Sequence, residues 1–258
     1  MDNRYERQIV MPEIGATGQE QLRQSRVLVV GAGGLGSPIL LYLAAAGVGT
    51  LGIADNDQVA VSNLNRQILY VAHDIGRSKA LTAVQRVRAL NPEIKGIPYE
   101  VRVLRENGLE LVQQYDLVVE ASDNLETKAL MNELCVHAGV PLVWGAVSRF
   151  EGQMGAYIPG HACRSCVFPQ TPKPGTYPTP AELGVLGASA GVIGALQAVE
   201  AVKILLNLDK PLLDTILLWE GLWNSFDVVE VERNPQCPVC GTTQHDVLQA
   251  ESTEVIYS

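Results

Sequence analysis

A glycine-rich segment near the start of the chain contains residues that could bind a phosphate. Gly31-Ala-Gly-Gly-Leu-Gly36 follows the apolar run 27–30 and precedes a helical stretch over 38–46. Small residues let backbone N–H groups approach an anion at a helix N-terminus. Asp55 ends the next apolar run, nineteen positions after Gly36, where an acid can accept hydrogen bonds from ribose hydroxyls. The pattern predicts nucleotide binding at Gly31, Gly33, Gly34, Gly36 and Asp55, against the alternative of a glycine-rich turn without a ligand.

The polar stretch after Asp55 favours ATP over a nicotinamide dinucleotide. Its residues with phosphate-binding or metal-binding side chains are Asp57, Asn63, Arg66, Gln67 and Lys79. A helix N-terminus largely neutralises the diphosphate of a dinucleotide, whereas three phosphates favour additional cations such as Arg66 and Lys79. Asn63 would add a neutral donor, and a nearby carboxylate would bind Mg²⁺. The chain has no Gly-x-x-x-x-Gly-Lys-Ser/Thr segment, so a P-loop is excluded.

A third polar group follows the apolar run 117–121. Its sequence is Ser122-Asp123-Asn124. Ligand-binding residues of a doubly wound fold lie at the carboxyl ends of its strands, so Asp123 is a candidate Mg²⁺ ligand and Asn124 a candidate nucleotide contact. The alternative interpretation is that Asp123 caps a helix beginning near Leu125, and the two roles are compatible.

Two Cys-x-x-Cys pairs lie in the second half of the chain. They are Cys163 with Cys166 and Cys237 with Cys240. Four thiolates form a closed tetrahedral Zn²⁺ site with no position left for catalysis. Redox pairs and a set of reduced thiols remain alternatives, because the two pairs are farther apart than in compact zinc ribbons. The fifth cysteine, Cys135, falls in an apolar helical pattern and is expected to be a buried core thiol.

The composition describes a globular protein with an acidic surface. The residues are 47% hydrophobic and 18% charged, and the formal net charge is −9. Nucleic acids and anionic membranes select basic surfaces, so neither is an expected partner. No stretch approaches the length of a membrane-spanning helix and no export signal is recognisable, so we expect a cytoplasmic protein.

The chemistry-bearing residues need a parallel sheet to bring them together. Short apolar runs at 27–30, 50–54, 97–103, 117–121 and 142–146 alternate with helical patterns at 38–46, 78–90, 106–114 and 125–137. This alternation predicts an α/β fold with a doubly wound, Rossmann-like, mostly parallel sheet. After about residue 150 the chain becomes β-rich, with a Pro-rich loop at 169–180, a helix over 191–207 and a ribbon formed by 212–218 and 226–231.

Taken together, these motifs resemble the MoeB/ThiF/HesA family of adenylyltransferases, which are related to the ubiquitin-activating enzymes. The resemblance begins at Arg4-Tyr-Glu-Arg-Gln8 and continues through the glycine loop, Asp55-Asn-Asp57, 62–67, Lys79, 122–124, both cysteine pairs and the helix 191–206. It implies a homodimer that binds ATP and Mg²⁺. The C-terminal glycine carboxylate of a ubiquitin-like sulfur-carrier protein, ThiS-like or MoaD-like and ending in Gly-Gly, would attack the α-phosphate and release pyrophosphate.

The resemblance also implies roles for individual residues. Asp55 matches the ribose-binding acid, Asp123 matches the magnesium aspartate, and Arg7 matches an arginine that reaches the ATP of the neighbouring subunit. Asn63, Arg66 and Lys79 match the phosphate contacts. Residues 1–150 would form the nucleotide-binding region with its N-terminal arm, and 151–258 a carrier-binding and zinc-site region, within one integrated domain.

Other activities fit parts of the pattern. A peptide or a tRNA could be adenylated by the same fold, and the acidic charge argues against tRNA. An NAD-dependent oxidoreductase would leave Arg66, Lys79, Asp123 and the cysteine pairs without a role, and a non-catalytic subunit would not need the complete polar set. The thiamine, molybdopterin or other pathway of the carrier is not determined by the sequence. Without an added rhodanese-like segment, a separate sulfur donor is expected.

Overall fold

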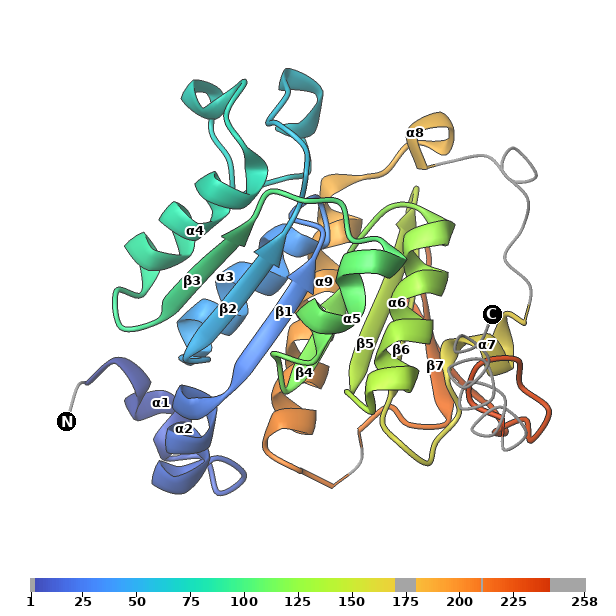
Figure 1. The fold of residues 1–258 in the computed structure, drawn as a ribbon. Helices are drawn as coiled ribbons and strands as arrows, with labels where there is room; N and C mark the ends of the chain where they lie inside the picture. The colour runs from blue at the N-terminus through green and yellow to red at the C-terminus, as the bar shows by residue number, and fades with distance from the viewer. Residues whose placement is uncertain (1–2, 170–179, 210, 242–258) are drawn as a thin grey trace, which may run out of the picture.

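The computed structural model describes residues 3–169, 180–209 and 211–241. Most of the Pro-rich segment 169–180 therefore lies outside the described residues, as does the chain after Gly241. Within the described residues the fold is a single eight-stranded sheet with helices on both faces (Figure 1). This arrangement confirms the predicted mostly parallel α/β fold.

The sheet has the strand order β3-β2-β1-β4-β5-β6-β7-β8. The parallel strands are β1 (Arg26–Val30), β2 (Thr50–Ala54), β3 (Lys95–Tyr99), β4 (Leu117–Glu120) and β5 (Leu142–Ser148). The antiparallel extension consists of β6 (Glu151–Tyr157), β7 (Thr215–Glu220) and β8 (Ser225–Glu230). Strand order reverses beside β1, so the carboxyl ends of β1 and β4 border the crevice where ligands of such sheets bind.

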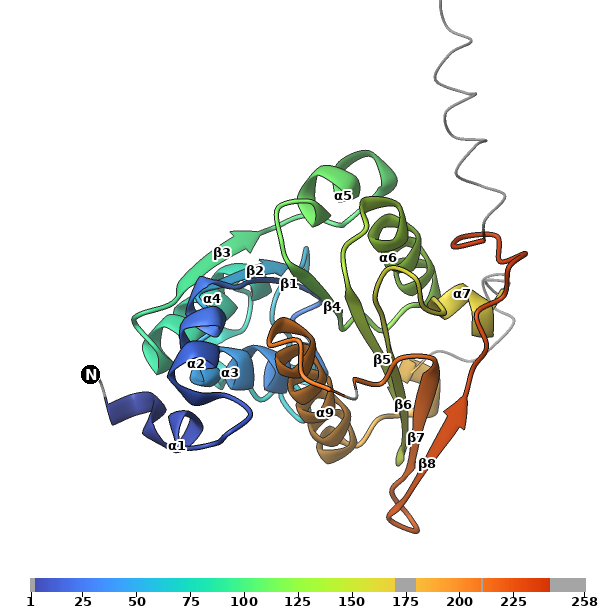
Figure 2. The same ribbon diagram turned by 90° about the horizontal axis from the view of Figure 1, so that it is seen from below.

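Helices cover both faces of the sheet, as Figure 2 shows. One face carries α2 (Gly15–Gln24), α3 (Gly36–Ala46), α4 (Lys79–Leu90) and α9 (Gly187–Leu205). The other carries α5 (Arg105–Val112) and α6 (Leu125–Ala138). Each layer encloses its own apolar core, because alternate residues of a strand point to opposite faces: Val27 and Val29 belong to the first core, Leu28 and Val30 to the second.

Short elements complete the chain. They are η1 (Asn3–Tyr5), α1 (Glu6–Ile9), η2 (Val61–Asn63), η3 (Ala72–Asp74), α7 (Arg164–Val167) and α8 (Pro180–Leu183). The last of these follows the Pro-rich segment and leads toward the long helix α9.

Two elements depart from the predicted bounds by four residues at one end. The strand expected over 97–103 is observed as β3 at Lys95–Tyr99. It pairs residue by residue with β2, which ends at Ala54, so no partner remains beyond Tyr99. The helix expected from residue 191 begins at Gly187, and two residues of its first turn, Ser189 and Ala190, are buried.

The expectation that no stretch approaches the length of a membrane-spanning helix is wrong for α9, which is, among the described residues, the one helix long and apolar enough to cross a membrane by length and composition. Half of its apolar window is buried inside the protein. It packs mainly against α3, β5 and β6. These contacts are those of a core helix, and a core helix can be as apolar as a membrane-spanning one.

Candidate active site

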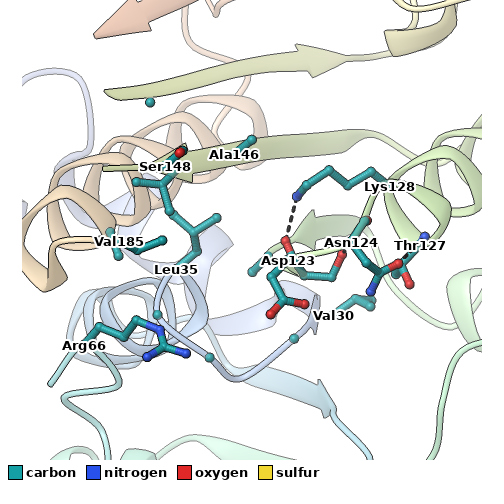
Figure 3. Close-up of a pocket in the computed structure, with 18 of the residues that line it drawn as sticks. Val30, Leu35, Arg66, Asp123, Asn124, Thr127, Lys128, Ala146, Ser148 and Val185 are labelled. Carbon is teal, nitrogen blue, oxygen red and sulfur yellow. Dashed lines mark hydrogen bonds between the residues drawn. The ribbon is translucent and has the colours of Figure 1, made fainter. Parts of the chain in front are cut away.

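A cleft of about 1320 Å³ lies at the carboxyl ends of the parallel strands. The sequence-predicted residues that line it are Gly31, Gly33, Gly34, Asp55, Asp57, Arg66, Gln67, Lys79, Asp123 and Asn124. Figure 3 shows Asp123, Asn124 and Lys128 together on one side of the cleft, with Arg66 and Val185 on the other. Part of the remaining wall comes from the antiparallel extension, including Gly152 and Trp219. The fold thus brings four separate sequence motifs to one cavity.

The glycine loop makes a tight turn between β1 and α3. Gly31 has a positive φ of 97°, and a Cβ there would lie 2.8 Å from the backbone of Ala121. A Cβ on Gly36 would lie 2.1 Å from the carbonyl oxygen of Gly31. Both positions therefore require glycine. No side chain caps the N-terminus of α3. The N–H of Ser37 donates to the carbonyl of Gly33 at 3.0 Å and Pro38 has no N–H, which leaves the N–H of Gly36 for an anion at this end of the helix.

Asp55 stands at the end of β2 and its carboxylate faces the glycine loop. It accepts hydrogen bonds from the backbone N–H of Ala32 at 2.8 Å and of Asp57 at 2.9 Å. Burial raises the pKa of Asp55, while the nearby Lys79 charge and the two N–H groups oppose that rise. The free lone pairs of this fixed carboxylate can accept ribose hydroxyls.

Lys79 and Arg66 supply the positive charge of the cleft at two places. Lys79 begins α4, is buried, and its Nζ donates to Asp57 Oδ2 at 2.8 Å. Arg66 is half-buried and donates to the carbonyl of Ser62 at 2.8 Å and to Asn65 Oδ1 at 3.1 Å. These bonds leave N–H donors free on the Arg66 guanidinium and on the Lys79 ammonium, so both groups can still bind phosphate.

The two amides predicted beside Arg66 have different surroundings. Asn63 Oδ1 accepts the backbone N–H of Ala60 at 3.0 Å, and Asn63 is not one of the residues that line the cleft. Gln67 lines the cleft, is 4% exposed, and its Oε1 has no hydrogen-bond partner among the described residues. A buried polar atom without a partner is costly unless a ligand satisfies it, so Gln67 fits a polar ligand beside the glycine loop.

The helix cap that the sequence offered for Asp123 is made by the next residue, Asn124. Asn124 is the N-cap of α6, because its Oδ1 accepts the N–H of Thr127 at 2.7 Å. Asp123 is exposed in the cleft, and its carboxylate has no hydrogen bond or ion pair with any described residue. A free carboxylate in a cleft that Arg66 and Lys79 also line has the chemistry of a Mg²⁺ ligand.

The sequence interpretation missed an ion pair behind this loop. Lys128 on α6 and Glu120 at the end of β4 are 4% and 0% exposed, and Lys128 also lines the cleft. A glutamate ending the apolar run Leu117-Val-Val-Glu120 was the available signal, since an unpaired acid is rarely fully buried. Its partner lies eight positions away and was not identifiable by local spacing.

Arg7 lies outside the cleft. It is on α1, at the other end of the sheet from the carboxyl ends of the parallel strands (Figure 1). Tyr5 fixes this arm by donating to Glu93 Oε2 at 3.1 Å, and Arg4 donates to the carbonyl of Leu90 at 3.0 Å. Arg7 does not line the cleft of its own chain.

The four paired cysteines meet at one place beside α6 and α7. The Sγ atoms of Cys163, Cys166, Cys237 and Cys240 all lie within 4.8 Å of one another. Sγ separations of 3.7 Å for Cys163–Cys237 and 3.5 Å for Cys166–Cys240 exclude disulfide bonds. A tetrahedral ion with Zn–S bonds of about 2.3 Å would place its sulfurs about 3.8 Å apart, so the cluster could hold a metal.

Backbone and side-chain N–H groups surround this cluster. Asn132 Nδ2 lies 3.6 Å from Cys163 Sγ, and the backbone N–H of Asn234 lies 3.5 Å from Cys166 Sγ. Such donors stabilise thiolates and orient them as ligands. Cys135, in contrast, is fully buried in α6 and burial raises the pKa of its thiol, as expected for a core residue.

The comparisons with known proteins agree with this arrangement. The ThiF family model matches residues 5–239. A sulfur carrier protein adenylyltransferase of Thermus thermophilus is 47% identical, over 97% of this chain and 95% of that protein. A SAMP-activating enzyme E1 of Haloferax volcanii is 46% identical, over 93% of this chain and 88% of that protein. A crystal structure of E. coli MccB with ATP has a TM-score of 0.79 and 25% identity, covering 93% of this chain and 75% of that one. Because the family model and these relatives match almost the whole chain, the protein belongs to the ThiF family, as its motifs suggested.

Proposed function

We propose that this protein uses ATP to adenylate the C-terminal glycine carboxylate of a ubiquitin-like sulfur-carrier protein. The observation that carries the proposal is the free carboxylate of Asp123 in the cleft that also holds the glycine loop, Asp55, Arg66 and Lys79. A dehydrogenase would use the glycine loop and Asp55 but would need none of Asp123, Arg66 and Lys79. The 47% identical relative is named for adenylation of a sulfur carrier, which supports the same substrate class here.

Each part of the cleft would act on one part of ATP. The N–H groups of the glycine loop and α3 would bind phosphate oxygens, Asp55 would orient the ribose, and Arg66 with Lys79 would neutralise the phosphates. Asp123 would hold Mg²⁺, which supplies further neutralisation of the phosphate charge. In the reaction a carboxylate oxygen of the carrier forms a bond to the α-phosphorus, and the bond from that phosphorus to the bridging oxygen breaks. Pyrophosphate leaves and an acyl-adenylate remains.

The carrier tail would reach the α-phosphate along the wall formed by the antiparallel strands. Gly152 on β6 and Trp219 on β7 line this wall, which joins the nucleotide end of the cleft without a break. A tail of two glycines has no side chains to exclude it from a narrow passage. We therefore assign residues 151–258 to carrier and metal binding within the same domain as residues 1–150, and a separate sulfur donor would act on the product.

Homodimerisation and zinc binding complete the proposal. Arg7 lies at the opposite end of the sheet from its own cleft, so it would serve the ATP of a second subunit. The four thiolates would hold Zn²⁺ in a closed, structural site.

Together with reduced cysteines and an acidic surface, the relation to carrier-activating enzymes favours a cytoplasmic location.

The direct test is ATP–pyrophosphate exchange with a panel of purified carriers that end in Gly-Gly. One carrier should stimulate exchange, and the same carrier with an amidated C-terminus, which lacks the attacking carboxylate, should not. Exchange stimulated instead by a peptide or a tRNA would replace the carrier with that substrate. Absence of exchange with every substrate would refute the adenylation itself.

A further inference from the structure

A buried ion pair lies directly behind the loop that carries Asp123. The ammonium of Lys128 donates to Glu120 Oε2 at 2.7 Å, to the carbonyl oxygen of Ser122 at 2.7 Å and to the carbonyl oxygen of Gly145 at 2.6 Å. These three acceptors match the three donors of an ammonium group. Figure 3 shows Lys128 beside Asp123, with one of these bonds drawn. No donor of Lys128 is left for a phosphate.

The ion pair fixes Ser122 through every polar group that this residue has. Glu120 Oε1 accepts the backbone N–H of Ser122 at 2.8 Å and also the hydroxyl of Ser122. Lys128 binds its carbonyl oxygen, which belongs to the peptide group that joins Ser122 to Asp123. That peptide cannot rotate without breaking hydrogen bonds to a buried charge. The direction in which Asp123 leaves the loop is therefore set by Glu120 and Lys128.

Two further elements fix the ion pair from behind. Gln197 on α9 donates to the carbonyl of Glu120 at 3.0 Å. Gly145 on β5, which supplies the third acceptor for Lys128, has no room for a side chain, because a Cβ would lie 2.5 Å from Gln197 Oε1. Strands β4 and β5 and helices α6 and α9 thus meet at this point. The support of the loop comes from rigid elements on both faces of the sheet.

The place of this buried ion pair indicates that it positions the loop of Asp123 and does not mainly stabilise the fold. A buried ion pair contributes little net stability relative to apolar residues of the same size, because desolvation offsets the attraction. Asp123 itself has no hydrogen bond with a described residue, so no neighbouring side chain holds its carboxylate, and the backbone that sets the direction of its Cα–Cβ bond is the part of Asp123 that the protein holds in place. A metal ligand must be held within a fraction of an ångström, and supporting hydrogen bonds commonly provide that precision.

We infer that Lys128 and Glu120 are positioning residues that hold the Asp123 carboxylate where it can bind the divalent cation of the nucleotide. The inference rests on the proposed function for the identity of that nucleotide. Neither side chain is assigned a contact with ATP. Their effect reaches the metal through the backbone of Ser122. In this they differ from Arg66 and Lys79, which are proposed to contact the phosphates directly.

The test compares Lys128→Met, Lys128→Arg and the double variant Glu120→Gln/Lys128→Met. The double variant leaves no unpaired buried charge, so it should fold even where Lys128→Met alone does not. Lys203→Met is the matched control. Lys203 forms a mostly buried ion pair with Glu200 on α9, and neither residue lines the cleft. Circular dichroism and the midpoint of thermal unfolding establish that each variant is folded.

The readouts are the Mg²⁺ concentration that half-saturates ATP–pyrophosphate exchange and, independently of turnover, Mn²⁺ binding with ATP followed by electron paramagnetic resonance. We expect the double variant to need about tenfold more cation or higher in both measurements, which is the usual cost of losing metal-supporting hydrogen bonds. Its KM for the carrier should stay within about twofold of wild type, because the fault lies at the metal. Lys128→Arg should recover part of the cation affinity, and Lys203→Met should keep all of it.

Folded variants with wild-type cation requirements in both measurements would overturn the inference. An equal loss in Lys203→Met would also overturn it, because a general loss of stability would then explain the effect. Failure of wild-type protein to exchange pyrophosphate would refute the proposed function alone, since Mn²⁺ binding in the presence of ATP still tests the positioning role.

Discussion

Replacing Asp123 by Asn tests the cleft with the least disturbance to the fold. The side chain is exposed and has no hydrogen bond or ion pair with any described residue. Asn124, the next residue, caps α6, so the helix keeps its cap in the variant. Asparagine has the shape of aspartate but lacks its charge. The substitution therefore removes one negative charge from the cleft and no contact from the protein.

The expected magnitudes for stability and for activity are well separated. Substitutions of exposed residues without partners usually change the free energy of unfolding by less than about 0.5 kcal/mol. Loss of one electrostatic contact that stabilises a transition state costs about 2.7–4 kcal/mol, which is a rate loss of about 10²–10³. Asp123→Asn should then unfold like wild type and adenylate about 10²–10³ times more slowly. The Mg²⁺ requirement should rise as well.

The assay is carrier-dependent ATP–pyrophosphate exchange at several Mg²⁺ concentrations, with thermal unfolding measured on the same preparations. Glu126→Gln is the matched control, because Glu126 is an exposed acid of the same corner of the cleft, 3.8 Å from Arg102. It removes the same charge from a residue without an assigned metal contact, and exchange should stay within a few-fold of wild type. Exchange by Asp123→Asn within a few-fold of wild type at every Mg²⁺ concentration would refute the assignment.

Three further predictions concern the dimer, the metal and the ribose site. Mixing Arg7→Ala subunits with Asp123→Ala subunits should restore part of the exchange activity, because one cleft in each mixed dimer keeps both residues; no recovery in verified mixed dimers would contradict action between subunits. Freshly reduced protein should contain about one zinc per chain by elemental analysis, and Cys237→Ser or chelation should lower the thermal midpoint, since structural zinc binding is worth about 10–16 kcal/mol in finger peptides; little zinc and no effect of chelation would contradict a structural site. Burial raises the pKa of Asp55, although the Lys79 charge and two backbone N–H groups partly oppose this rise. The carboxylate therefore becomes protonated at a higher pH than that of an ordinary aspartate. Because the protonated form cannot accept ribose hydroxyls as well, ATP affinity should fall as the pH is lowered through this raised pKa. Calorimetry between about pH 7 and about pH 4 should show this fall in wild type and a flatter profile in Asp55→Asn.

The polar networks show where local patterns were insufficient. Both Asp123 and Asn124 are common helix-capping residues, and only the observed bond from Thr127 to Asn124 assigns the cap. In the same way, Asn63 accepts a backbone N–H of its own turn, which its position in the sequence did not reveal. Its predicted role at the phosphates remains a prediction. The pairing of Glu120 with Lys128 depends on how α6 packs against the end of β4.

The sequence by itself determined the alternating strands and helices, the tight glycine turn after β1 and the acid at the end of β2. These features depend on residues close together in the chain, where apolar periodicity and the backbone freedom of glycine act directly. Only the tertiary structure decided which distant residues meet. Cys163 and Cys237 are 74 positions apart and their sulfurs lie 3.7 Å from each other. Such contacts follow from strand order and helix packing, which place side chains to within an ångström by the combined burial of the whole core, and no local pattern contains that information.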